Sequence, residues 1–246
     1  MRSTSTRGSQ DSKEVANVEK FNQLAGYAFE NGIRFHLDSV QAYKNDSYAT
    51  AYHLALIASE EIGKALMLEE YYFQHFFNGW DEKDPHIKKF LESIFSAHRT
   101  KQKWFGRMAN DFLSDHPPLK PASVLVQSMM EGVMEEVKQN TTYVGLTKKG
   151  KKVDLNGKMV VPRLFAQPEK ARKQITLNND FMAVYTSGFL RGMYGTDSYY
   201  IAINLEKGYL DTYLSEWEFK GRLAAKILKE HEGTPYKKRP LEDWDE

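Results

Sequence analysis

The stretch SEEIGKALMLEEY, residues 59–71, carries two adjacent carboxylates within an otherwise largely apolar segment. Its apolar side chains recur at helical spacing, and we expect the helix to extend over about residues 48–77. The apolar stripe consists of Ala51, Leu54, Ala55, Ala58, Ile62, Ala65 and Leu66. On the helical wheel Glu61 falls inside this stripe and Lys64 at its border, whereas Glu60 is expected to point toward solvent. The segment therefore predicts a buried helix face that carries a glutamate.

A further helix, expected over about residues 85–113, also has polar side chains on its apolar stripe. His98 and Lys101 occupy that stripe three residues apart, so they are neighbours on one helix face. In the first helix, Asn31 adjoins apolar positions in the same way. An isolated charge in an apolar interior is costly, so these side chains should meet one another. We expect one polar cluster of Glu61, Lys64, His98 and Lys101, with Asn31 and Glu60 as supporting candidates.

Two interpretations of this cluster remain open from the residues alone. Buried ion pairs and hydrogen-bonded histidines occur in many helical bundles that have no catalytic activity. The other interpretation is acid–base chemistry, in which a carboxylate fixes the tautomer of a histidine and lysines stabilise charge on a phosphate. Cleavage of RNA through its 2′-hydroxyl needs these groups and no metal ion.

The rest of the chain predicts a mainly α-helical domain. Helical periodicity recurs in several further segments, and Asn45-Asp46-Ser47 separates the first two helices and offers capping side chains. The further helices are expected over about residues 14–44, 122–139 and 168–191, with more helix to about residue 230. We expect a flexible lead (1–13), a helical core (14–140), a hairpin insertion (141–167), C-terminal helices (168–230) and a tail (231–246).

The insertion has short β-prone runs and an Asn156-Gly157 turn, which predict an exposed hairpin. Four lysines surround Gly150 at its tip: Lys148, Lys149, Lys151 and Lys152. Such a basic tip is able to contact RNA phosphates, so these lysines are RNA-binding candidates. A lysine-rich turn is also commonly no more than a solvated surface.

Composition narrows the classes of function. A formal net charge of +1 gives no overall attraction to nucleic acids or membranes, and the absence of cysteine excludes disulfides and thiolate metal sites. No apolar run is long enough to span a membrane and the first residues lack a secretory signal, so a cytoplasmic protein is expected. There is no P-loop, nucleophile elbow or dinucleotide fingerprint, and we predict no cofactor and no metal site.

Several segments, in this order, resemble the AbiV abortive-infection proteins, a branch of the HEPN superfamily. The resemblance covers roughly residues 20 to 190. It lies in Tyr48 with Ala51, Leu54 and Ala55, in Glu60-Glu61-Ile62-Gly63-Lys64-Ala65, in His98-Arg99-Thr100-Lys101 and in Tyr143-Val144 with Pro162 and Glu169-Lys170-Ala171. It implies a HEPN-type four-helix core, often dimeric, and a role in prokaryotic antiphage defence.

Many HEPN proteins are metal-independent endoribonucleases with an R-x(4–6)-H motif, and this chain has no such motif. If RNA is cleaved, His98 would be the general acid or base, Glu61 would orient it, and Lys64 and Lys101 would stabilise phosphate charge. The resemblance thus implies a protein that arrests translation or acts on RNA, with RNA, a phage-encoded activator and a second copy of the chain as partners. The alternative is a non-catalytic helical protein that binds a phage or host protein.

Overall fold

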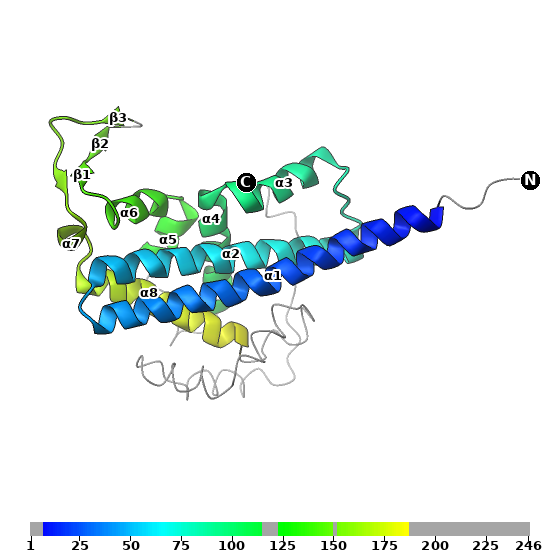
Figure 1. Ribbon diagram of the computed structural model, residues 1–246, viewed down its shortest axis with the longest axis horizontal. Helices are drawn as coiled ribbons and strands as arrows, with labels where there is room; N and C mark the ends of the chain where they lie inside the picture. The colour runs from blue at the N-terminus through cyan, green and yellow to red at the C-terminus, as the bar shows by residue number, and fades with distance from the viewer. Residues whose placement is uncertain (1–6, 115–122, 150–151, 187–246) are drawn as a thin grey trace, which may run out of the picture.

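The computed structural model describes residues 7–114, 123–149 and 152–186, which form a mainly α-helical structure (Figure 1). Its helices are α1 (Arg7–Lys44), α2 (Tyr48–Asn78), α3 (Pro85–Ser96), α4 (His98–Ser114), α5 (Ser123–Met130), α6 (Met134–Asn140), α7 (Pro162–Phe165) and α8 (Pro168–Thr186). Its strands are β1 (Gly145–Leu146), β2 (Lys148–Lys149), β3 (Lys152–Val153) and β4 (Met159–Val160). The mainly helical prediction is confirmed. The first helix begins at Arg7, well before the expected start at residue 14.

Helices α1 and α2 form the long hairpin that organises the bundle (Figure 1). The turn between them places Asp46 at a φ of 58°, a conformation that asparagine and aspartate tolerate better than most residues. Ser47 stands at the N-cap of α2, but its hydroxyl donates to Thr50 Oγ1 at 3.0 Å and makes no capping bond to the backbone. The position of the predicted cap is therefore right, although its hydrogen bond is different.

The helix expected over residues 85–113 is divided into α3 and α4. Ala97 adopts an extended conformation, with φ of −103° and ψ of 97°, so α4 starts in a new direction at His98. That direction carries the first turn of α4 against Gly63 of α2, where a Cβ atom would lie 2.2 Å from the carbonyl oxygen of Lys101. Gly63 thus permits a backbone-to-backbone crossing that any other residue would obstruct.

The expected fourth helix is also divided, because Gly132 adopts a φ of 73° between α5 and α6. The turn folds α6 back along α2, so that a short helix covers a face of α2 that we predicted to be open to solvent. Glycine takes this left-handed conformation at little cost.

The insertion after α6 is a hairpin, as predicted, and is built from two short antiparallel ladders. In the outer ladder β1 pairs with β4, and in the inner ladder β2 pairs with β3. The predicted Asn156-Gly157 turn occurs between β3 and β4, where the Asp154 carbonyl oxygen accepts from Gly157 N–H at 2.8 Å. The predicted tip around Gly150 falls on residues 150–151, between β2 and β3, which lie outside the described residues.

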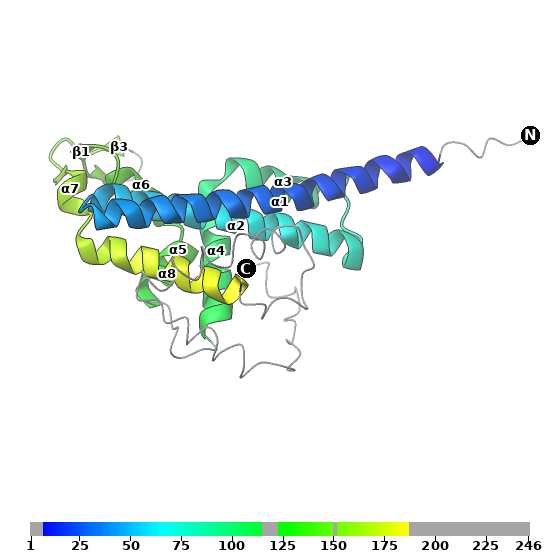
Figure 2. The ribbon, with the colours of Figure 1, turned by 60° about the horizontal axis from the view of Figure 1, so that its bottom comes forward.

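Helix α8 packs along the α1–α2 pair and closes the core, as Figure 2 shows. The largest fully buried side chains include Phe29, Leu56, Ile62, Phe105 and Phe181, so α1, α2, α4 and α8 share one apolar interior. A buried polar seam crosses it, in which Ser59 Oγ donates to Asn178 Oδ1 at 2.7 Å and Gln174 Nε2 donates to Ser59 Oγ at 2.9 Å. The predicted C-terminal helices beyond Thr186, the tail and residues 1–6 of the lead lie outside the described residues.

Candidate active site

The adjacent glutamates of α2 point into different surroundings. Glu60 is only 4% exposed, because α4 and α6 cover its face of α2. The prediction that Glu60 points toward solvent is therefore wrong, and so is the prediction that Glu61 pairs with His98. A helical wheel gives the direction of a side chain but not the neighbour that covers it, and the divided helices were needed to place α6.

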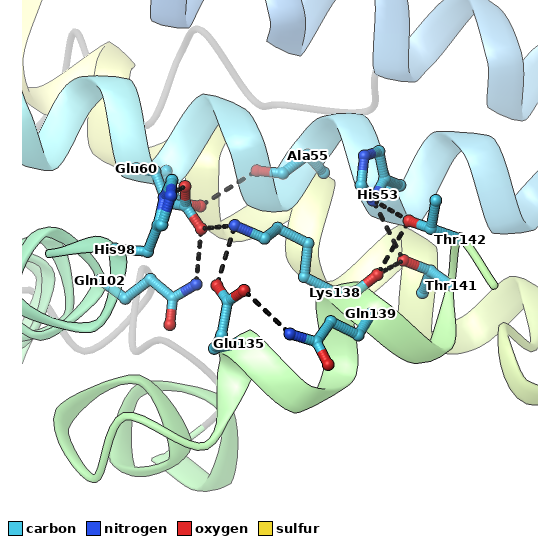
Figure 3. A network of polar contacts seen from close by, with 11 residues as sticks. His53, Ala55, Glu60, His98, Gln102, Glu135, Lys138, Gln139, Thr141 and Thr142 are labelled. Carbon is cyan, nitrogen blue, oxygen red and sulfur yellow. Dashed lines mark hydrogen bonds and ion pairs between the residues drawn. The ribbon is translucent and has the colours of Figure 1, made fainter. Parts of the chain in front are cut away.

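Glu60 is the centre of a connected polar group, shown in Figure 3. Its Oε2 lies 2.9 Å from His98 Nδ1, and its Oε1 accepts from Gln102 Nε2 and from Lys138 Nζ, each at 2.7 Å. Lys138 Nζ also lies 2.8 Å from Glu135 Oε2. We call Glu60, His98, Gln102, Glu135 and Lys138 the Glu60 centre. It joins residues of α2, α4 and α6 that are far apart in the sequence.

The ion pair between Lys138 and Glu135 keeps both groups charged despite their partial burial. Burial pushes the pKa of Lys138 downward, but hydrogen bonds and ion pairs with Glu135 and Glu60 outweigh it, so the pKa is raised. Burial likewise pushes the pKa of Glu135 upward, yet the contact with Lys138 prevails and the pKa is lowered. Lys138 is therefore an ammonium and Glu135 a carboxylate at neutral pH.

His98 is the exposed member of the centre, with 56% of its side chain accessible. Since the Glu60 carboxylate accepts a hydrogen bond, the neutral imidazole carries its proton on Nδ1 and leaves Nε2 as an acceptor. A buried carboxylate that fixes the tautomer of an accessible histidine is an arrangement suited to general-base catalysis. The pair can then return the proton as a general acid.

Lys101 is buried within electrostatic reach of both glutamates. It is 5% exposed, and burial lowers its pKa, while the charges of Glu60 and Glu61 oppose that shift. The predicted cluster is thus divided: His98 joins Glu60, Glu61 and Lys64 lie together elsewhere, and Lys101 interacts electrostatically with both glutamates.

Glu61 belongs to a second polar group on the outer face of α1 and α2. Its Oε2 accepts from Asn31 Nδ2 at 2.9 Å and lies 3.8 Å from Lys64 Nζ, and Arg34 donates to Asn31 Oδ1 at 2.8 Å. The predicted neighbourhood of Asn31, Glu61 and Lys64 is confirmed. These residues line a hollow of about 670 Å³, which we call the α1–α2 groove.

Gln102, Glu135 and Lys138 were not among the predicted site residues. Gln102 follows His98 by four residues, so it shares that helix face and was within reach of the same argument. Glu135 and Lys138 form an acid–base pair at i and i+3 within the expected fourth helix, but nothing in the sequence showed that this helix turns back at Gly132.

The predicted RNA-binding lysines belong to the hairpin, which follows α6 and contains no residue of the Glu60 centre or of the group around Glu61. Lys148 and Lys149 form β2, Lys152 begins β3 and is exposed, and Lys151 lies outside the described residues. The base of the hairpin is fastened to α2, where His53 Nδ1 lies 2.8 Å from Thr142 Oγ1 (Figure 3). Contact between these lysines and RNA remains a prediction.

Although we predicted no metal site, one group of described residues has metal-ligating spacing. The ligand atoms of Glu60, His98 and Glu135 all lie within 4.8 Å of one another. Carboxylates and imidazole are ligands that zinc and related ions accept. However, Lys138 already bridges the two carboxylates with a positive charge.

A family model described as AbiV, of the HEPN type, matches residues 20–183. The chain belongs to the AbiV family. The match includes both glutamates, His98 and Lys138, so every residue of the Glu60 centre lies within the part shared with this family. Membership indicates an abortive-infection function of the HEPN type. No curated protein and no solved structure matches the chain of this AbiV-family protein.

No helix among the described residues of this AbiV-family protein is long and apolar enough to cross a membrane.

Proposed function

We propose that this protein arrests growth in phage-infected cells by acting on RNA, with His98 and Glu60 as its acid–base pair. The observation that carries the proposal is the 2.9 Å contact between a buried carboxylate and a histidine whose side chain is 56% exposed. The family match supports the biological setting, and the geometry supports the chemistry.

In the proposed reaction the Nε2 atom of His98 removes the proton from an RNA 2′-hydroxyl. The 2′-oxygen attacks the adjacent phosphorus, a cyclic phosphate forms, and the 5′-oxygen leaves with the proton that the His98 imidazolium returns to it. Glu60 holds the imidazole through Nδ1 and stabilises the imidazolium that forms. Lys101 and Lys138 add positive potential to this side of α2, and the hairpin lysines are proposed to hold the RNA backbone.

The test is RNA integrity in cells that express the protein, with and without phage infection. Replacing His98 by alanine should abolish RNA fragmentation and protection from phage. His86→Ala is the matched control, because His86 is an exposed histidine in the first turn of α3 and lies outside the Glu60 centre. Intact RNA in infected, growth-arrested cells that carry the unaltered protein would refute the enzymatic proposal.

The second candidate function is binding of a phage or host protein without catalysis. It is favoured by exposed aromatic side chains at the end of α2, where Phe76 is 52% and Phe77 is 70% exposed. If this candidate is correct, Phe77→Ser should abolish protection from phage, while His98→Ala should reduce it only as far as it lowers the melting temperature.

We further propose that the protein acts in the cytoplasm as a homodimer and responds to a phage-encoded protein, as the family resemblance implies. Light scattering on the purified chain tests the dimer. Co-purification from infected cells tests the activator.

A further inference from the structure

Three side chains of the Glu60 centre form a triangle of potential metal ligands, and Lys138 already contacts two of them. One carboxylate oxygen of Glu60, one of Glu135 and one imidazole nitrogen of His98 lie within 4.8 Å of one another. Two carboxylates and one imidazole would suit Zn²⁺ or Co²⁺, with water completing the coordination.

The ammonium group of Lys138 lies between the two carboxylates, as Figure 3 shows. Its Nζ atom is 2.7 Å from Glu60 Oε1 and 2.8 Å from Glu135 Oε2, and only 13% of the Lys138 side chain is exposed. An ammonium and a divalent ion cannot share these oxygens, because like charges at this separation repel strongly where little water intervenes. Lys101, buried nearby, adds to the same repulsion.

We propose that Lys138 is a built-in cation that takes the place of a divalent metal ion and holds Glu60 in position to orient His98. Glu60 Oε1 faces Lys138 and Gln102, which leaves Oε2 directed at His98. Lys138 is thus a positioning residue, and it acts on the histidine through Glu60. Its effect on metal binding does not depend on the proposed action on RNA.

This arrangement has a measurable consequence, because removal of the ammonium should turn the triangle into a metal site. Lys138→Met deletes the charge and keeps a flexible apolar side chain in the same space. Glu60 and Glu135 then lose the cation that bridged them, and a divalent ion relieves their repulsion. Lys138→Arg keeps the charge and should continue to exclude metal.

The experiment uses the full chain and titrates Co²⁺ by visible absorption and Zn²⁺ by calorimetry. We expect Lys138→Met to bind one ion at least about tenfold more tightly than the unaltered protein. In the unaltered protein the ion would first have to displace the charge-assisted hydrogen bonds between the Lys138 ammonium and the two carboxylates. The added site should disappear in the double variant Lys138→Met/His98→Ala. Lys103→Met removes an exposed lysine of α4 and should behave like the unaltered protein.

Equal metal affinity in the unaltered protein and Lys138→Met would overturn the proposal. If Lys138→Met folds poorly without metal, thermal melting provides the same comparison: a Zn²⁺-dependent rise in melting temperature that His98→Ala abolishes supports the inference, and no rise refutes it. If Lys138→Met gains metal binding, but RNA stays intact in infected, growth-arrested cells that carry the unaltered protein, only the proposed function is refuted.

Discussion

Replacing Gly63 by alanine should destabilise the protein and separate the residues of the Glu60 centre. A Cβ atom at this position would lie 2.2 Å from the carbonyl oxygen of Lys101, where ordinary contacts begin at about 3.4 Å. The obstacle is backbone, so the two helices must move apart by about 1 Å.

The expected net loss follows from two opposing effects. Overpacking of a rigid contact costs about 1–3 kcal/mol, and the upper end applies because no side chain can rotate away. Alanine in place of glycine inside a helix stabilises the helix by about 1 kcal/mol. We therefore expect the free energy of unfolding to fall by about 2 kcal/mol, measured by urea denaturation with an unchanged m-value.

The same displacement bears on the proposed chemistry. Gly63 follows Glu60 by one helical turn, and Lys101 follows His98 by one turn, so the crossing lies directly beside the 2.9 Å contact. An added separation of about 1 Å breaks a hydrogen bond of this length. We expect Gly63→Ala to lose RNA fragmentation even at temperatures where it remains folded.

The matched control is Gly32→Ala on α1, whose added Cβ would lie 2.8 Å from Cγ1 of the buried Ile62 but 3.3 Å from the nearest backbone atoms. It should cost less stability than Gly63→Ala and should leave RNA fragmentation intact. If Gly63→Ala proves as stable as the unaltered protein, the close crossing of α2 and α4 is absent and the reasoning fails.

Other substitutions separate the parts of the structure in simpler ways. Glu60→Gln should abolish RNA fragmentation in cells, whereas Glu61→Gln should preserve it, because only Glu60 contacts His98. Ser59→Ala removes the hydroxyl that joins Gln174 to Asn178 in the buried seam, and should lower the free energy of unfolding by about 1–3 kcal/mol in urea denaturation. Burial lowers the pKa of His36 from an ordinary 6.5 to about 3. Between these pH values the imidazole is protonated in the unfolded chain but neutral in the folded chain, so the free energy of unfolding falls as the pH falls. From pH 6.5 to 5 this contribution is about 2 kcal/mol, and chemical denaturation of His36→Gln across that range should show a correspondingly smaller slope.

The sequence predicted the two long helices and the break between them correctly, because both depend on continuous periodicity and on the polar run Asn45-Asp46-Ser47. Asn31, Glu61 and Lys64 could be placed together since each faces the partner helix at a known angle. The Glu60 centre could not be predicted in this way. It depends on chain reversals at Ala97 and Gly132, and their directions are set by tertiary packing more than by local propensity.

Consecutive residues in a helix point about 100° apart, so two adjacent glutamates necessarily serve different neighbours. Glu60 faces α4 and α6 and contacts an imidazole, an ammonium group and an amide, whereas Glu61 faces α1 and lines the groove. Lys101 is buried, and the charges of both glutamates oppose the lowering of its pKa by that burial. Neutralisation of Glu61 would remove one of the two negative charges that oppose the lowering of the Lys101 pKa by burial, so a change in the groove reaches Lys101 through its pKa.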